Sequence, residues 1–469
     1  MRRAAVAVAL LLTGACRLAP RHVRPALPTP PIYLVASDSD VAAGARAADI
    51  GWREFFQDPR LNALIAAALE HNRDLVVAVA QIEEARGLYG IQRADRLPSV
   101  GANAGATRTQ SSGAASGVPG VGSTTFDRYS VGVAVPAFEL DFWGRVRNLS
   151  EAARSRYLAT IQAQRAFRLT LIEDVASAYL SSVEVTEEIT VAESAVKSRK
   201  EGVRIAKVRL DAGLTSALDF HQAETLLTQA EAALAGLHLL EAQQNNLLFF
   251  LVGGPLAAPA PDALPLAQQI NPAVLAAGLP SELLLVRPDI IAAEEQLRAA
   301  EANVGAARAA FFPSISLTGN VGYASTDLNN LVGRDGLTWS FGPSITLPIF
   351  NHGRLAGGMT VARARENIAI ADYERTIQVA FRDVSNALAG RRFLAEQVAA
   401  QERGTLAQRQ IAALAHTRYS EGVVGYIEVL DAERNLFTAE QALLQLRRVE
   451  ADNLVALYIS LGGGAIEQR

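Results

Sequence analysis

The stretch at residues 145–209 reads RVRNLSEAARSRYLATIQAQRAFRLTLIEDVASAYLSSVEVTEEITVAESAVKSRKEGVRIAKVR. It contains no proline and only one glycine, Gly202. A continuous helix over this stretch would be about 95 Å long, at a rise of 1.5 Å per residue. Helices in globular domains usually run for ~8–20 residues, so this length indicates a coiled coil or a helical tube.

The same pattern returns in the second half of the chain, where residues 355–419 also lack proline. GR at residues 144–145 matches GR at 353–354, and LVGG at 251–254 matches SLGG at 460–463, both at an offset of 209 residues. Upstream, LPSV at 97–100 matches FPSI at 312–315 at an offset of 215. The chain is therefore an internal repeat, and the first half carries a few extra residues in its Gly/Ser/Thr-rich tract at 110–125.

Each half is expected to contain the same series of elements. A helix ends before Pro98 or Pro313, and two short strands with period-2 alternation follow, at 99–104 and 129–135 or at 314–318 and 339–347. The long helix comes next and breaks at a glycine-containing turn, DAGLT at 211–215 or SEGVVG at 420–425. A shorter helix then returns to a Gly-Gly pair, so each half predicts one antiparallel helical hairpin.

Four strands per chain are too few to close a barrel, because the smallest membrane barrels have about eight strands. The hairpins also cannot cover both of their own faces. Both deficits predict an oligomer, although this arithmetic alone leaves two, three or four copies open.

The first residues predict an export signal followed by a lipid anchor. A basic start, an apolar run at residues 4–12 and small residues lead to Cys16, which is the only cysteine. We expect a signal peptide at 1–15, lipidation of Cys16 and an anchored extension at 16–56. Thr13 stands where a lipoprotein site usually has an aliphatic residue, so an ordinary signal peptide with an incidental cysteine is the alternative.

Composition argues against several classes of function. The chain has 44 basic and 48 acidic residues and a net charge of −4, which is unlike a nucleic-acid-binding surface. The single cysteine and six scattered histidines show no metal-binding spacing. The glycine-rich tract at 117–124 lacks the lysine of a phosphate-binding loop. We therefore expect no enzyme, no cofactor, no metal site and no catalytic residue.

Several motifs together resemble one family. They are ELDFWGR at 139–145, RPDIIAAEEQL at 287–297, AARAAFFPSI at 306–315, YIEVLDAE at 426–433 and LYISLGGG at 457–464. They resemble the TolC-like outer-membrane efflux family, in particular the lipoprotein branch that serves RND multidrug pumps. The resemblance covers nearly all of the chain after the signal peptide.

This resemblance implies an α+β membrane protein. It would be a homotrimer with a twelve-stranded outer-membrane β-barrel, continuous with a periplasmic α-helical barrel of coiled-coil hairpins. It also implies a Gram-negative outer membrane, a periplasmic adaptor and an inner-membrane RND transporter. The expected segments are a first repeat at 57–255, a linker at 256–280, a second repeat at 281–464 and a tail at 465–469.

The helix tips are the expected functional site, because in this family they form the periplasmic aperture. Asp431 matches the family's aperture aspartate, and Glu428 lies three residues earlier on the same helical face. Inward-facing copies would form an acidic, cation-attracting ring. Capping remains an equal alternative for Glu428, which sits in the first helical turn after Gly425. A solvated helix face is the alternative for Asp431.

The residues on either side of the turns complete the predicted site. Tyr419 matches a tyrosine that helps to hold the family's entrance shut, and Arg418 is a candidate charged partner. The family's arginine a few residues further on is replaced here by Val424. The expected adaptor-docking tips are Gly213, Leu214, Thr215, Gly422, Val423 and Val424, for which plain turn chemistry is the alternative.

The predicted function is a passive exit duct for drugs and small molecules, gated by the adaptor. A type I protein-secretion duct of the same fold is one alternative. A periplasmic coiled-coil scaffold lipoprotein without a pore is another, although the four amphipathic strands argue against it.

Overall fold

The structure is a computed structural model that describes residues 18–33, 45–112, 122–255, 263–270, 275–276 and 283–464. The chain forms two compact units. The first, here called the strand unit, comprises residues 1–25, 81–160 and 292–373; the hairpin unit comprises 26–80, 161–291 and 374–469. Each unit contains matching parts of both repeats. Cys16, the signal peptide, the tail and most of the 256–280 linker lie outside the described residues.

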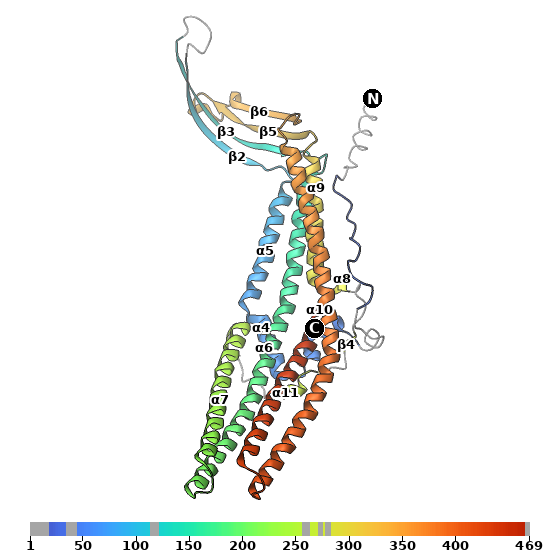
Figure 1. Ribbon diagram of the computed structural model, residues 1–469. Coiled ribbons are helices and arrows are strands. Elements are labelled where there is room, and N and C mark those ends of the chain that lie inside the picture. Colours follow the sequence, from blue (N-terminus) through green and yellow to red (C-terminus); the bar gives the residue numbers. More distant parts are fainter. Residues whose placement is uncertain are drawn as a thin grey trace. The chain divides into compact units, whose positions relative to one another are not determined.

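The strand unit is built around one antiparallel sheet. Its strands are β2 (Gly101–Ser111), β3 (Thr124–Glu139), β5 (Ser314–Ser325) and β6 (Leu337–Thr346), in the order β2-β3-β5-β6. Each repeat supplies one hairpin, and the pairing of β3 with β5 joins them in the middle of the sheet (Figure 1). The strands of the first repeat extend beyond the predicted segments and into both ends of the Gly/Ser/Thr-rich tract at 110–125.

Long helices begin directly after each pair of strands. α6 (Arg145–Asp211) and α10 (Arg354–Ser420) both contain 67 residues, which confirms the predicted long helices. Gly144 and Gly353, with φ of +76° and +82°, make the corner before each helix. The preceding helices, α5 (Arg73–Ala94) and α9 (Pro288–Ala309), end before Pro98 and Pro313 as predicted.

In the hairpin unit, each long helix turns back at its tip. α6 is followed by α7 (Ala217–Val252), and α10 is followed by α11 (Tyr426–Ser460), which forms the two predicted antiparallel hairpins (Figure 1). The unit also contains α3 (Trp52–Phe55), α4 (Pro59–His71), α8 (Leu283–Val286) and the 3-10 turns Ala47–Asp49 and Leu266–Gln268. A short parallel pair joins β1 (Ala45–Arg46) to β4 (Leu275–Ala276).

Asp58 is the polar centre of the hairpin unit's core and is completely buried. It caps α4 by accepting from Arg60 N at 2.7 Å, and it also accepts from Tyr179 Oη at 2.7 Å. Leu264 N and Gln269 Nε2, both at 2.9 Å, complete four donors. Burial alone would raise the pKa of Asp58, but these hydrogen bonds outweigh it and lower the pKa. One carboxylate therefore ties α4, α6 and the segment after α7 together.

Within the described part of the chain, no helix combines the length and the apolar character that a membrane-spanning helix needs.

Candidate functional site at the helical tips

The two tips have the same backbone turn. Gly213 and Gly422 adopt φ of +70° and +75°, a region that favours glycine. In the first tip, Gly213 N donates to Leu210 O and Leu214 N donates to Arg209 O. The second tip has the same two hydrogen bonds, between residues that lie 209 positions further along the sequence. These two hydrogen bonds close the C-terminus of each long helix in a Schellman motif.

The turns leave one large apolar side chain exposed at each tip. Leu214 is 70% exposed and Val423 is 64% exposed. The Schellman motif usually packs this residue against the helix it follows, so exposure on both tips is informative. The predicted docking residues thus lie at the ends of the hairpins, where a partner has access to two apolar side chains.

The first tip is stabilised by its own side chains. Ser216 and Asp219 form a complete capping box at the start of α7. The Asp219 carboxylate also accepts from the Thr215 hydroxyl. These bonds, led by the one from Thr215, hold the pKa of Asp219 below its usual range.

The second tip has no such cap. Gly425 stands at the N-cap of α11, where it offers no side chain. Glu428 instead forms an ion pair with Arg418 Nη1 at 2.6 Å, across the turn. Both side chains are about half exposed, at 43% and 51%. Arg418 and Glu428, two of the predicted gate residues, are therefore brought together directly.

Asp431 lies one turn further along α11. Its carboxylate is 54% exposed and pairs with Arg434 Nη2 at 2.8 Å. The carboxylate thus remains accessible from solvent, but an arginine of its own helix partly neutralises it. Sequence reasoning missed this arginine, although its spacing of three residues from Asp431 was a usable signal.

Tyr419 joins the two hairpins through its ring. The guanidinium of Arg209, at the end of α6, lies 4.9 Å from the centre of the Tyr419 ring. The ring of Tyr426 lies 5.0 Å from it on the other side of the turn. Among the described residues, the Tyr419 hydroxyl has no hydrogen-bond partner.

Tyr426 occupies a notch on α6 that only glycine can provide. A Cβ placed on Gly202 would lie 1.8 Å from Tyr426 Oη and 3.1 Å from its Cζ. Burial raises the pKa of the Tyr426 hydroxyl, so this phenol remains neutral. Neither residue was among the predicted site residues. The sequence did contain one signal, because Gly202 is the only glycine within the long helix α6.

Further from the tips, polar contacts continue the connection between the hairpins. Glu433 Oε1 accepts from Ser198 Oγ of α6 and contacts His416 Nε2 of α10, both at 2.8 Å. Arg199 is 4% exposed, donates to Leu226 O at 3.0 Å and lies over the Phe437 ring. Burial lowers the pKa of Arg199. We call this set of contacts the inter-hairpin seam: Ser198, Arg199, Gly202, Arg209, His416, Tyr419, Tyr426, Glu433 and Phe437.

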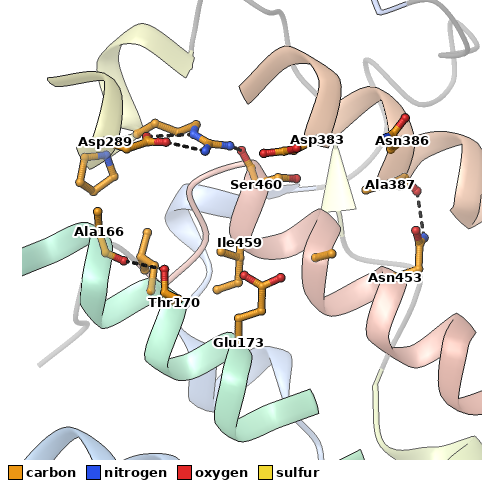
Figure 2. Close-up of a pocket in the computed structure, with 14 residues that line it drawn as sticks. Ala166, Thr170, Glu173, Asp289, Asp383, Asn386, Ala387, Asn453, Ile459 and Ser460 are labelled. Atoms are coloured by element: carbon orange, nitrogen blue, oxygen red, sulfur yellow. Dashed lines mark hydrogen bonds and ion pairs between the residues drawn. The ribbon is translucent and has the colours of Figure 1, made fainter. Parts of the chain in front are cut away.

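A cavity of about 520 Å³ lies within the hairpin unit, away from the tips (Figure 2). Its lining includes Glu173, whose pKa is raised by burial and then by the nearby carboxylates of Asp174 and Asp383. Asp289 is held by Arg287 at 2.6 Å, and the same guanidinium donates to Ser460 O. The lining mixes polar and apolar residues, and charges in it are paired or suppressed by burial, which suits a gap between helices better than a reaction site.

The sheet has two chemically different faces. Directly paired residues share a face, so one row across the four strands consists of Ala102, Val133, Val321 and Trp339. The next row, on the opposite face, consists of Asn103, Gly132, Gly322 and Thr338. The apolar row is open to the surroundings, with Trp339 74% exposed and Val321 53% exposed. This alternation of apolar and small or polar faces is typical of transmembrane strands.

Comparison with known proteins agrees with these features. The family model for "Outer membrane efflux protein" matches residues 64–254 and 279–463. The chain belongs to the outer membrane efflux protein family. It is a non-enzymatic channel protein of the outer membrane, as the sequence predicted. The predicted fold class, that of the trimeric outer-membrane channels, is confirmed.

Individual relatives match the chain over almost its whole length. The cation efflux system protein CusC of Escherichia coli O6:H1 is 40% identical and is covered to 97%, as is this chain. The toluene efflux pump outer membrane protein TtgI of Pseudomonas putida is 41% identical, with 97% of each chain covered. The solved MtrE outer membrane channel of Neisseria gonorrhoeae, in its open state, superimposes with a TM-score of 0.87 at 39% identity, covering 96% of this chain and 99% of that one.

Proposed function

We propose that three copies of this chain form the exit duct of a tripartite efflux pump, with a transmembrane barrel of twelve strands. The observation that carries this proposal is the two-faced sheet. Its apolar rows suit contact with lipid, and its rows of small and polar residues suit a water-filled lumen.

The sheet edges support closure by identical copies. β2 and β6 each pair with one neighbour only among the described strands, so each has a free edge. An exposed edge of long strands is prone to pair with another chain. Pairing β6 of one copy with β2 of the next gives a ring without edges.

The gate of this duct is the tip of the second hairpin. In a symmetric trimer, Asp431 and Glu428 would be repeated around the axis as an acidic constriction. Arg434 and Arg418 moderate that charge. The inter-hairpin seam, with Tyr419 and Tyr426 at its end, holds the second hairpin against the first. Opening requires these contacts to be exchanged for contacts with an adaptor, which must bind the open state more tightly.

The adaptor is proposed to dock on the tips. Leu214 and Val423 provide exposed apolar anchors on turns of identical shape, and Gly213 and Gly422 leave the backbone accessible. Thr215 and Val424 complete each turn. The inner-membrane partner would be an RND transporter, as in the family that the motifs resemble.

The cargo is not a property of this subunit alone. Relatives of about 40% identity are named for cations and for toluene. A passive duct is compatible with this range because the pump selects the cargo and the duct only conducts it. Lipidation of Cys16 would add an anchor in the same membrane.

The experiment that tests the channel combines two measurements on the purified protein. Heat-dependent gel mobility and conductance in planar lipid bilayers should both be positive. A folded oligomer whose mobility does not change with heating, and which never conducts, would favour the scaffold lipoprotein. A deletion strain tests the alternative of a type I secretion duct. Loss of drug efflux with intact protein secretion would favour the efflux duct. Loss of protein secretion with intact drug efflux would favour the secretion duct.

A further inference from the structure

The corner between sheet and long helix occurs twice in the strand unit, once per repeat. Residues 139–145 start at the last residue of β3, and residues 348–354, at the same offset of 209 residues, follow β6. Both corners have a positive-φ glycine, Gly144 or Gly353, directly before the helix, and the second also has a positive φ of +51° at His352. The two corners also differ in their side chains.

The first corner satisfies its own charges. Glu139 accepts two hydrogen bonds from Arg145 Nε, at 2.9 and 3.2 Å, and a further short one from Nη2. Asp141 accepts from Arg147 N at 2.7 Å, in the first turn of α6. The arginine at the start of α6 is thus fully engaged by its own chain.

The second corner has lost both carboxylates. Pro348 stands at the position of Glu139, and Phe350 stands at the position of Asp141. Arg354, the counterpart of Arg145, is exposed, and no acceptor in the described part of the chain contacts its guanidinium. An exposed cation therefore remains where the first repeat has a closed ion pair.

Two large apolar residues precede this cation in the chain. Ile349 is 90% exposed and Phe350 is 78% exposed. They follow Ile345, at the end of β6, and Leu347, directly after it, which are 70% and 51% exposed. Adjacent exposed apolar residues of this size usually mark a contact with a partner or a membrane.

A cavity of about 370 Å³ lies between the two corners. Arg354 and Asn351 line it, together with Trp143, Phe312 and Pro348. The Glu139–Arg145 pair also lines it, but this pair is neutral as a unit. Arg354 therefore leaves the cavity with one uncompensated positive charge beside aromatic and aliphatic walls.

We propose that the second corner binds a glycerophospholipid of the periplasmic leaflet. Ile349 and Phe350 insert among the acyl chains, and the Arg354 guanidinium donates to the headgroup phosphate, which it matches in a bidentate geometry. The cavity receives the polar part of the lipid. This inference rests on the proposed orientation, in which the sheet crosses the outer membrane and the helices lie in the periplasm. It assigns one such lipid to each subunit and none to the first corner.

The test is native mass spectrometry of the full-length protein in detergent, titrated with dioleoylphosphatidylglycerol. Arg354→Gln should weaken binding of one lipid per subunit by about tenfold, the loss expected for one charge-assisted hydrogen bond. Pro348→Glu should have a similar effect, because it restores the carboxylate of the first repeat next to Arg354. Arg363→Gln, at an exposed arginine further along α10, is the matched control and should bind lipid like the wild type.

Equal lipid affinity in the wild type, Arg354→Gln and Pro348→Glu would overturn the proposal. So would displacement of the lipid by inorganic phosphate with no effect of Phe350→Ser, because the site would then be a simple anion site. If Phe350→Ser lowers trimer stability and leaves lipid binding unchanged, a second copy of the chain covers this surface instead. Conductance measurements separate the lipid site from the proposed channel function. A wild type that binds lipid but never conducts counts against the channel and not against the lipid site.

Discussion

The tips of the two hairpins share a backbone turn but are stabilised in opposite ways. The first tip is closed by Ser216 and Asp219, which lie on its own hairpin. In the second repeat, glycine and glutamate occupy these positions. Stability comes from an exposed ion pair within the hairpin and from two tyrosine rings that pack on the hairpin's own core and also contact α6. A tip that caps its own helix stays folded when its hairpin moves. A tip that relies on contacts with a neighbouring helix is sensitive to its distance from that helix. The second hairpin is therefore the one suited to move.

The largest expected effect comes from filling the notch on α6. Gly202→Ala places a Cβ where Tyr426 Oη now lies, so the Tyr426 ring must leave. Overpacking of this kind costs about 1–3 kcal/mol and should favour separated hairpins by about fivefold or more. Single-channel recording should show a larger open conductance or a higher open probability.

The control for this variant is Gly236→Ala on α7, where an added Cβ meets nothing within 4 Å. It should conduct like the wild type. If Gly202→Ala also conducts like the wild type, the notch does not hold the second hairpin.

Exchanging the caps should make the two tips more alike. Ser216→Ala removes the capping box and should destabilise the start of α7 by about 1 kcal/mol. Gly425→Ser, with Glu428 already three residues later, should build a capping box at the start of α11 and gain a few tenths of a kcal/mol. Hydrogen exchange of the first-turn amides measures both. Faster exchange in α7 without any gain in α11 would mean that the seam, and not the cap, sets the stability of the second tip.

Removing Arg434, which partly neutralises Asp431, should increase the difference in charge between the two tips. Exposed ion pairs contribute only about 0.2–1 kcal/mol, so Arg434→Gln should leave folding nearly unchanged. The constriction should become more cation-selective, measured as a shift of reversal potential in asymmetric KCl. Thr225 occupies the corresponding position of the first hairpin, and Thr225→Ala should leave selectivity unchanged.

The smallest effect is a pH dependence confined to the first tip. Because hydrogen bonds from Thr215 and Ser216 lower the pKa of Asp219, the capping box is fully stabilising above the pKa of an unfolded aspartate. This stabilisation is lost as the pH falls through the lowered pKa of the folded state. The protection of the amides at the start of α7, taken relative to their intrinsic exchange rate at the same pH, should therefore fall on acidification, and Asp219→Asn should abolish that pH dependence. A pH dependence that survives in Asp219→Asn would assign it to another group.

Sequence patterns predicted the long helices, the hairpins and the turns because these follow from local signals. Proline and glycine marked the ends of elements, and repetition confirmed each one. The strands were predicted too short. The positions opposite the apolar face carry Asn103, Gly132 and Gly322, and small or polar residues of this kind resemble a loop when the opposite face is not yet known.

The predicted site residues were partly brought together by the fold. Arg418 and Glu428 meet because they lie on either side of one short turn, which the sequence shows. Gly202 and Tyr426 are far apart in the chain, and their contact depends on how closely two hairpins approach. No local sequence pattern predicts the distance between the two hairpins. The role of Asp58 could not be predicted, because three of its four donors come from side chains and amides that only the fold brings to it.

The central claim is that the second tip is the gate and that Asp431 lies in it. The most direct test is single-channel conductance in a planar bilayer for the wild type, Asp431→Asn and Gln222→Ala, the last at the matching position of the first hairpin. We predict small, cation-preferring events in the wild type, altered size or selectivity in Asp431→Asn, and wild-type behaviour in Gln222→Ala. If Asp431→Asn matches the wild type, or if Gln222→Ala changes conductance as strongly, the acidic gate at the second tip is contradicted.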